Sequence, residues 1–331
     1  MNCMLTGASG FIGSHLLARL AADPGNRIDI LRSAAPAVET PLGQNVRAHS
    51  LAGGVAALDY ADIDVVFHVG AIRPKFGTTR EAYRAGNVDL PVAFYRAAAS
   101  GGARRFVFVS SISVFGWPAA DALPITDQHP YRADTLYGWS KGEAERQLRA
   151  AAAGASTKLV IVRPSIVYGP NDPRGMVTKL TELIAKGTYL TVGNGHNRVQ
   201  LIYIDDVITA LCLAAIQQVP SGEGFIVTGA QPITIDRLVR RLSELLDRTV
   251  PRLRIPVAAA RVVAGVLEGL YACGLKLTGP EPMIHREGIM TMTRDRCYAI
   301  DHARHGLGFE PVVDYDEGLR RTVADYRRSR Q

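Results

Sequence analysis

The stretch Thr6-Gly7-Ala8-Ser9-Gly10-Phe11-Ile12-Gly13 follows a short apolar run, residues 2–6, and opens an amphipathic run, residues 10–22. The first run has the length and composition of a buried strand, and the second has the periodicity of a helix. A strand, a glycine-spaced turn and a helix in this order are typical of a dinucleotide site. The stretch therefore predicts the first unit of an α/β nucleotide-binding fold.

Each glycine of this turn has a separate physical task. Gly7 permits the tight turn, Gly10 lets the backbone approach a diphosphate, and Gly13 allows the helix to lie close to the sheet. Phe11 and Ile12 lie at the N-terminus of the helix, which carries a partial positive charge and favours bound anions. We expect these five residues to contact the cofactor.

Strand-like and helix-like segments alternate through the first half of the chain. Repeated βα units of this kind build a parallel sheet with helices on both faces. The expected strands are residues 2–6, 27–31, 64–69, 105–110 and 158–163, and the expected helices between them include residues 79–101 and 136–153. The prediction is a Rossmann-type doubly wound parallel sheet in residues 1–168.

The pattern becomes mixed after Pro164, with glycine and proline punctuation. A chain of 331 residues is long for a single core. Residues 169–331 are expected to form mostly a smaller, mixed C-terminal lobe that binds substrate. Residues 201–204 and 224–227 are predicted to return as strands to the main sheet.

Composition and charge restrict the partners. The net charge is +7, but no nucleic-acid-binding module accompanies the arginines near the C-terminus, so no nucleic-acid partner is expected. The four cysteines show no metal-ligand spacing, so no metal site is predicted. No signal peptide precedes the first strand, and a reduced, cytoplasmic protein is the interpretation.

The most apolar later stretch, residues 257–277, is interrupted by Arg261, Glu268 and Lys276. These charges argue against a membrane-spanning helix. We expect the stretch to pack against the other lobe, with peripheral contact at a membrane surface as the alternative.

The end of the second predicted strand bears on the choice of cofactor. An NAD site usually has an acidic residue there, which accepts hydrogen bonds from the ribose. This chain has Arg32 and Ser33 instead. An arginine pairs well with a 2′-phosphate and a serine donates to it, so NADP is favoured over NAD.

Tyr137 and Lys141 stand at positions i and i+4 of a predicted helix, so they share one face. A free tyrosine has a pKa near 10, and a neighbouring ammonium is expected to lower it toward neutrality. Ser110 and Ser111 follow a predicted buried strand, at the edge where this fold presents ligand-binding groups. The pattern predicts proton transfer by Tyr137 beside a serine that orients the substrate oxygen.

The chain resembles the extended short-chain dehydrogenase/reductase family, within the NAD-dependent epimerase/dehydratase superfamily. Seven blocks carry the resemblance in the family's order: the glycine turn, residues 65–71, Asn87-Val88, residues 110–116, Tyr137 with Lys141, residues 163–170 and residues 203–207. The resemblance implies an NAD(P)-dependent oxidoreductase with Ser111, Tyr137 and Lys141 as its catalytic set.

The resemblance also assigns the remaining site residues. The cofactor would be lined by Gly70, Ala71, Asn87, Ser110, Pro164, Ser165 and Val167, with Tyr137 and Lys141 near its ribose and nicotinamide. The substrate would meet Arg73, Lys75, Ser111, Ser113 and Arg198. Family members commonly pair through the helices that hold Asn87 and Tyr137, so a homodimer is expected.

Three departures from the family's sequence patterns indicate which branch of the family the chain resembles. Ile112-Ser113 follows Ser111 where sugar-nucleotide dehydratases carry Asp-Glu, so elimination chemistry is not expected. Val199 stands where sugar-nucleotide epimerases place a diphosphate-binding arginine, and Arg198 lies one residue early. His49-Ser50-Leu51 replaces a common Gly-Asp-Leu, which alters adenine recognition.

Residues 193–199, residues 71–77 and the apolar C-terminal segment look more like the 3β-hydroxysteroid dehydrogenase-like branch. That branch implies interconversion of a ketone and a secondary alcohol on a hydrophobic substrate, steroid-like or β-keto acyl-like. A nucleotide-sugar epimerase is the first alternative. The second is a non-catalytic NADP-binding regulator, which the intact serine, tyrosine and lysine disfavour.

Overall fold

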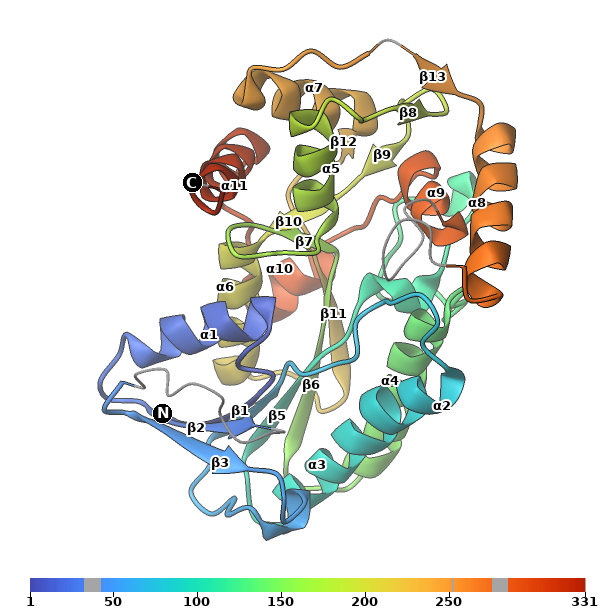
Figure 1. Ribbon diagram of the computed structural model, residues 1–331. Helices are drawn as coiled ribbons and strands as arrows, with labels where there is room; N and C mark the ends of the chain where they lie inside the picture. The colour runs from blue at the N-terminus through green and yellow to red at the C-terminus, as the bar shows by residue number, and fades with distance from the viewer. Residues whose placement is uncertain (33–42, 252, 276–284, 331) are drawn as a thin grey trace.

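The computed structural model describes residues 1–32, 43–251, 253–275 and 285–330 (Figure 1). Its centre is a seven-stranded sheet in which every neighbouring pair is parallel, in the order β11-β6-β5-β4-β1-β2-β3. The strands are β1 (Asn2–Thr6), β2 (Arg27–Arg32), β3 (Val46–Ser50), β4 (Val65–His68), β5 (Arg105–Val109), β6 (Lys158–Pro164) and β11 (Glu223–Val227). The predicted Rossmann-type fold class is confirmed.

Helices cover both faces of this sheet (Figure 1). One core contains Cys3 and Leu5 of β1 with residues of α1 (Phe11–Ala21) and α6 (Ile204–Ile216). The other contains Met4 of β1 with residues of α3 (Leu90–Ser100) and α4 (Leu136–Ala152). Successive side chains of a strand point to opposite faces. The central strands β4 and β5 are buried on both faces and are therefore largely apolar, whereas β3 at the edge of the sheet is mostly exposed.

The predicted helix 79–101 is divided into three parts. Thr79 caps α2 (Arg80–Arg84), a π-helical turn covers Ala85–Asp89, and α3 follows. Pro91 lies in the first turn of α3 and has no backbone N–H to donate, so the regular ladder is interrupted there. The wide turn places Asn87 in the interior, beside α4.

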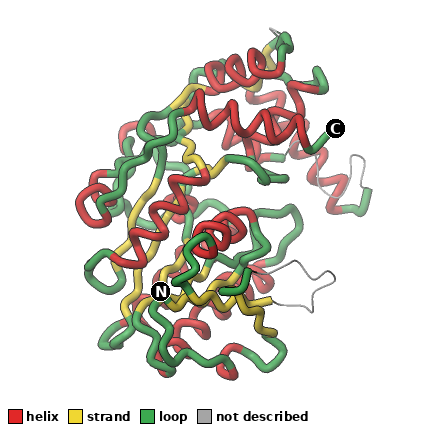
Figure 2. Tube along the Cα trace, turned by 90° about the vertical axis from the view of Figure 1, so that its left-hand side faces the viewer, coloured by secondary structure: helices red, strands yellow, loops and turns green. Residues whose placement is uncertain are grey.

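The C-terminal lobe lies beyond the carboxyl ends of the strands, because β6 runs almost directly into β7 (Figures 1 and 2). Three two-stranded sheets join β7 (Ile166–Tyr168) to β10 (Leu201–Tyr203), β9 (Arg198–Val199) to β12 (Ile233–Thr234), and β8 (Thr191–Val192) to β13 (Arg254–Ile255). The helices are α5 (Met176–Ala185), α7 (Ile235–Leu246), α8 (Val257–Ala272), α9 (Arg286–Thr293), α10 (Asp301–Leu307) and α11 (Tyr315–Arg328), and short 3-10 turns cover Val55–Ala57 and Ala120–Ala122.

One strand expectation is wrong. Residues 201–204 were expected in the main sheet, but β10 pairs with β7 in a separate sheet, and α6 begins at Ile204. A three-residue apolar strand fits either sheet equally well, so the sequence pattern does not distinguish them. Residues 223–227, by contrast, form β11 at the edge of the main sheet, beside β6.

Candidate active site

The glycine turn is a close contact between two strand ends. Gly7 has a φ of +74°, and a Cβ placed on it would lie 2.6 Å from the backbone nitrogen of Gly70. A Cβ on Gly13 would overlap the carbonyl oxygen of Gly7. Gly10 donates to Gly7 O at 2.9 Å and caps α1, whose first turn holds Phe11 and Ile12. Only glycine leaves this cradle open for a diphosphate.

Two buried polar residues, Thr6 and His68, lie next to the glycine turn and fix its position. The Thr6 hydroxyl accepts from the backbone N–H of Gly70 at 3.2 Å and lies 3.2 Å from Nδ1 of His68. Burial lowers the pKa of His68 to about 3, helped by the nearby Lys141 charge, so this imidazole is neutral. The contact fixes Gly70 and Ala71 beside the glycine turn, where the cofactor was predicted.

The second strand ends at Arg32, next to Ser50 of β3. The Arg32 side chain and Ser33, on which the expectation of NADP depends, lie outside the described residues. On β3, His49 contacts the Asp29 carboxylate at 2.8 Å.

The structure brings Ser111 and Tyr137 together at the carboxyl end of β5. Ser111 caps a 3-10 turn, Ile112–Phe115, and its hydroxyl accepts from the backbone N–H of Ser113 and donates to Oγ of Ser113, both at 3.1 Å. Thr135 caps α4 by accepting from Gly138 N at 3.0 Å. A Cβ on Gly138 would overlap the Ser113 carbonyl oxygen, so this glycine lets the helix touch the 3-10 turn.

Tyr137 lies in that first turn of α4, half-buried, with its ring edge-on to Tyr83 at 6.3 Å between centroids. Burial raises the pKa of Tyr137 to about 12, although a hydrogen bond with Ser111 and the charge of Arg73 act in the opposite direction. The expectation that the Lys141 ammonium lowers this pKa is therefore wrong for the structure as it stands. The phenol is in its protonated form at neutral pH.

Lys141 explains this difference, since its side chain extends into the protein. Its ammonium donates to the backbone carbonyl oxygen of Val109 at 2.8 Å and lies 4.7 Å from the centroid of the Phe108 ring. The side chain is 2% exposed, and burial lowers the pKa of Lys141 to about 7, with the Glu145 charge opposing that shift.

Beneath the site lies a buried ionic cluster that sequence reasoning missed. Glu145 accepts from Ser110 Oγ at 2.5 Å, from Nη2 of Arg163 at 2.8 Å, and from the Tyr131 hydroxyl. Arg163 also donates to Asp127 at 2.8 Å. The Ser110 hydroxyl, predicted to line the cofactor, is therefore directed to Glu145. A signal was present, because Glu145 follows Lys141 by four residues and so shares its helix face.

Of the other predicted cofactor residues, Asn87 lies in the π-helical turn before α3, and Pro164, Ser165 and Val167 lie at the junction of β6 and β7. Asn87 accepts from Ile72 N at 2.7 Å and donates to Ile72 O at 3.0 Å and to Ser140 Oγ at 3.1 Å, so it ties the loop after β4 to α4. Ser165 is buried at the junction between β6 and β7, with its hydroxyl 2.7 Å from that of Thr228. The glycine cradle and these strand ends fit a dinucleotide.

The predicted substrate residues are more widely spread. Arg73 lies 3.5 Å from Asp172 and is close enough to Tyr137 to affect its pKa, whereas Lys75 is exposed. Arg198 is held at the surface by Asp295, which accepts from its backbone N–H at 2.6 Å and lies 3.4 Å from its Nη2.

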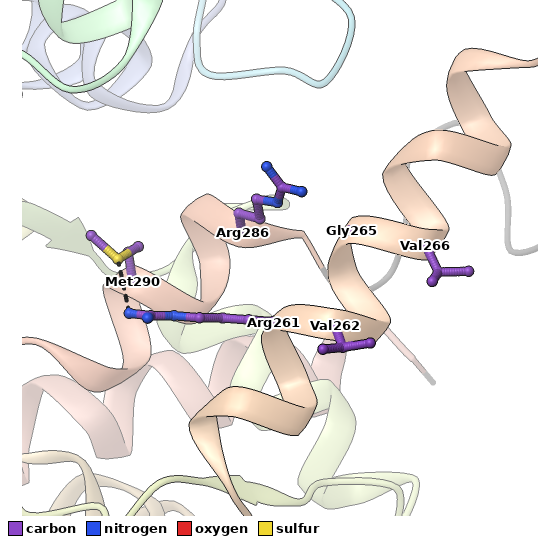
Figure 3. A pocket seen from close by; sticks show the side chains of 6 residues that line it. All are labelled: Arg261, Val262, Gly265, Val266, Arg286 and Met290. Atoms are coloured by element: carbon purple, nitrogen blue, oxygen red, sulfur yellow. Dashed lines mark hydrogen bonds between the residues drawn. The ribbon is translucent and has the colours of Figure 1, made fainter.

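A separate hollow of about 610 Å³ lies between α8 and α9 (Figure 3). It is lined by Arg261, Val262, Gly265, Val266, Arg286 and Met290, none of which was predicted to be a site residue. Val262 and Val266 are largely exposed on α8. Contact of this helix with a membrane surface stays a prediction; in the described ranges, no helix combines the length and apolarity needed to cross a bilayer.

A doubly wound sheet, a glycine cradle and a serine beside a helix-borne Tyr-x-x-x-Lys define a nicotinamide-dependent enzyme of the short-chain dehydrogenase/reductase type. Residues 3–227 match the family model of the NAD dependent epimerase/dehydratase family, and the chain belongs to this family.

Relatives with different named activities are about equally similar to the chain. It is 28% identical to a UDP-glucose 4-epimerase of Vibrio cholerae, over 97% of this chain and 94% of that protein. It is 29% identical to a 2-alkyl-3-oxoalkanoate reductase of Stenotrophomonas maltophilia, over 98% and 99%. It is also 29% identical to a 3 beta-hydroxysteroid dehydrogenase/Delta 5-->4-isomerase of Mycobacterium tuberculosis, over 98% and 90%.

Solved structures share the fold. The UDP-glucose 4-epimerase of Thermotoga maritima superposes with a TM-score of 0.77 at 21% identity and full coverage of both chains. The family-model match confirms the resemblance of the sequence to the family, and a relative of the 3β-hydroxysteroid dehydrogenase type is among those found.

Proposed function

We propose that the protein is an NADP-dependent oxidoreductase that interconverts a ketone and a secondary alcohol on a largely hydrophobic substrate. The observation that carries the proposal is the contact between Ser111 and a half-buried, protonated Tyr137. A neutral phenol beside a serine hydroxyl suits proton donation to the oxygen of a carbonyl under reduction.

Tyr137, Ser111 and Lys141 have different roles in the proposed reaction. The nicotinamide supplies the hydride when it is bound. Tyr137 gives its proton to the substrate oxygen, or accepts it in the reverse direction, and Ser111 holds that oxygen by a hydrogen bond. Lys141 acts as a positioning residue, because its ammonium donates to Val109 O and so ties α4, which carries Tyr137, to the end of β5.

The choice of a hydrophobic ketone over a nucleotide sugar is supported by the state of two residues in β9. Val199, at the place of the epimerases' diphosphate-binding arginine, is fully buried, and Arg198 is already paired with Asp295. A repositioned Arg198 would have to exchange that carboxylate for the diphosphate. The reductase and steroid dehydrogenase relatives favour the same choice.

A nucleotide-sugar epimerase is the second candidate, favoured by the 28% identity to the Vibrio cholerae enzyme across nearly both chains. The deciding experiment offers the purified protein a 2-alkyl-3-oxoalkanoate and a 3-oxosteroid with NADPH, and UDP-glucose with NAD. We expect NADPH oxidation with a ketone and no UDP-galactose. Formation of UDP-galactose without ketone reduction would establish the epimerase.

The cellular setting is also a proposal. A homodimer through the helical segments that hold Asn87 and Tyr137, and a cytoplasmic location, are what the family resemblance and the composition favour. Sedimentation of the purified protein tests the first of these directly.

A further inference from the structure

Helix α8, at the edge of the C-terminal lobe, is apolar on its exposed side as well as on its buried side (Figure 1). Ala264 and Tyr271 are buried against the lobe. Val262 and Val266, one helical turn apart, are 67% and 58% exposed. Of the ten large apolar side chains that are exposed in the described parts of the chain, five lie between residues 253 and 275. Exposed apolar side chains gathered in this way mark an interaction surface.

The one acidic residue of α8 is already engaged by the neighbouring helix α9. Glu268 accepts from the backbone N–H of Arg286 at 2.7 Å and lies 3.3 Å from its Nε. A Cβ on Gly265 would lie 3.0 Å from Nη2 of Arg286, so the missing side chain of Gly265 makes room for this guanidinium against α8. The negative charge of α8 is therefore balanced within the protein.

Arg261 adds a cation beside the exposed valines. Its Nη2 lies 3.8 Å from Sδ of Met290, and no carboxylate among the described residues lies within ion-pair distance of it. Figure 3 shows Arg261 extending toward α9, whereas Val262 and Val266 project away from α9. An apolar helix face with an unpaired arginine at its side complements the interface of a bilayer that contains anionic lipids.

The composition of this face favours a bilayer over a protein partner. The exposed residues of α8 are alanine, valine, glycine and Arg261, with no aromatic side chain. Protein–protein hot spots are enriched in tryptophan and tyrosine and poor in valine. With 16 residues, α8 is about 24 Å long, which is too short to cross a bilayer core of about 30 Å. It can lie only along the surface.

Principles of substrate supply favour the same partner, because α8 adjoins the loop that borders the predicted active site. Tyr271 meets Phe76 edge-on, with 6.1 Å between ring centroids. Phe76 follows Lys75, whose backbone N–H donates to the Tyr83 hydroxyl at 3.3 Å, and the Tyr83 ring packs against Tyr137. A hydrophobic substrate of the kind proposed above partitions into bilayers. Docking through α8 would bring this loop to the phase that holds the substrate.

We propose that α8 docks the protein on the surface of a bilayer that contains anionic phospholipids. Val262 and Val266 enter the boundary of the acyl chains, and Arg261 binds lipid phosphate, which its planar fork matches. Docking goes beyond the proposed reaction, and only the argument from substrate supply rests on that reaction.

The experiment measures flotation of the full-length protein with vesicles and needs no turnover. One set of vesicles is phosphatidylcholine alone, and the other contains about one third phosphatidylglycerol. Wild type is compared with the double variant Val262→Ser/Val266→Ser and with Arg261→Gln.

Each variant has a matched control elsewhere on the surface. Ile216→Ser/Val312→Ser removes two other exposed apolar side chains. Arg47→Gln removes an equal charge from exposed β3, at the opposite end of the molecule from α8 (Figure 1). NADPH affinity and the urea midpoint of every variant establish that it is folded.

We expect wild type to bind the anionic vesicles more tightly than phosphatidylcholine, with an affinity that falls as salt is added. Val262→Ser/Val266→Ser should weaken binding about tenfold or more on the anionic vesicles, because less apolar surface leaves water. Arg261→Gln should weaken binding about three- to tenfold on the anionic vesicles and leave phosphatidylcholine binding unchanged. Both controls should stay within about twofold of wild type.

A wild type that floats with neither kind of vesicle overturns the inference, as does a double variant that binds like wild type. Loss of a wild-type oligomer in the double variant, seen by sedimentation without vesicle binding, would assign the face to a second copy of the chain. Vesicle binding by a protein that reduces no ketone would contradict the proposed function alone. Ketone reduction without vesicle binding would contradict this inference alone.

Discussion

The Lys141 ammonium donates a 2.8 Å hydrogen bond to the Val109 carbonyl oxygen, at the end of the strand that leads to Ser111. The lysine of the Tyr-x-x-x-Lys pair is thus fixed by a hydrogen bond to the backbone of β5. Its pKa of about 7 lies below the usual lysine value of about 10.4.

This depressed pKa makes stability depend on pH. Between about pH 7 and pH 10 the unfolded chain binds one more proton than the folded chain, so the free energy of unfolding rises with pH there. The cost of burying the charge is full below pH 7. Lys141→Met removes this dependence, a few kcal/mol across the window. Urea unfolding at a series of pH values measures it.

Lys158→Met is the matched control, because Lys158 is exposed at the start of β6 and its loss should leave the slope unchanged. Parallel pH curves for wild type and Lys141→Met would contradict the assignment of a depressed pKa to Lys141.

Glu145 should be the most stability-sensitive carboxylate of α4. Glu145→Gln removes one of the two carboxylates that pair with buried Arg163, and breaking a buried ion pair in this way costs about 3–5 kcal/mol. Glu143→Gln, on the same helix but in a partly exposed pair with Arg146, should cost below about 1 kcal/mol. Chemical denaturation compares the two, and equal losses would contradict the special role of the cluster.

The raised pKa of Asp127 predicts that stability depends on pH with the sign opposite to that expected from Lys141. Burial raises the pKa of Asp127 to about 6, even though Arg163 and His302 favour its ionised form. Between about pH 4 and pH 6 the folded chain binds the extra proton, so the free energy of unfolding falls as pH rises. Asp127→Asn should flatten this part of the curve by about 2–3 kcal/mol. A variant that keeps the wild-type slope would assign the dependence to another group.

Cofactor preference depends on the end of β2. If Arg32 pairs with the 2′-phosphate, Arg32→Asp should weaken the binding of NADPH about 10- to 100-fold, because a charged hydrogen bond is lost and a like charge is added. NADH should then bind more tightly than NADPH. Arg27→Ala, at the other end of the strand, is the control. Fluorescence titration with both nucleotides gives the affinities, and unchanged preference in Arg32→Asp would exclude Arg32 as the phosphate contact.

The fold and the central contact of the site were predictable because both depend on local patterns. The glycine turn specifies its own backbone, and the spacing of Tyr137 and Lys141 places them on one helix face. Residues at strand ends of a parallel sheet meet at one edge, which brings Ser111 beside that helix.

The rest depends on packing that no local pattern encodes. The pKa of Tyr137 follows from how deeply the ring is covered, and Lys141 contacts Val109 O only because α4 lies on β5. Arg198 and Arg296 are equally cationic in the sequence, and only the fold pairs one with Asp295 and buries the other against Trp117. Tertiary packing also decides that β10 pairs with β7 and does not join the main sheet.

The central claim is proton transfer by Tyr137 during hydride transfer to a carbonyl. The most direct measurement follows deuterium from C4-deuterated NADPH into the product alcohol, for wild type, Tyr137→Phe and the control Tyr83→Phe, whose ring borders that of Tyr137. We predict deuterium at the carbinol carbon, a rate lowered about 10²- to 10⁴-fold in Tyr137→Phe with NADPH affinity kept, and a loss below about tenfold in Tyr83→Phe. Deuterium transfer by Tyr137→Phe at the wild-type rate would contradict the account.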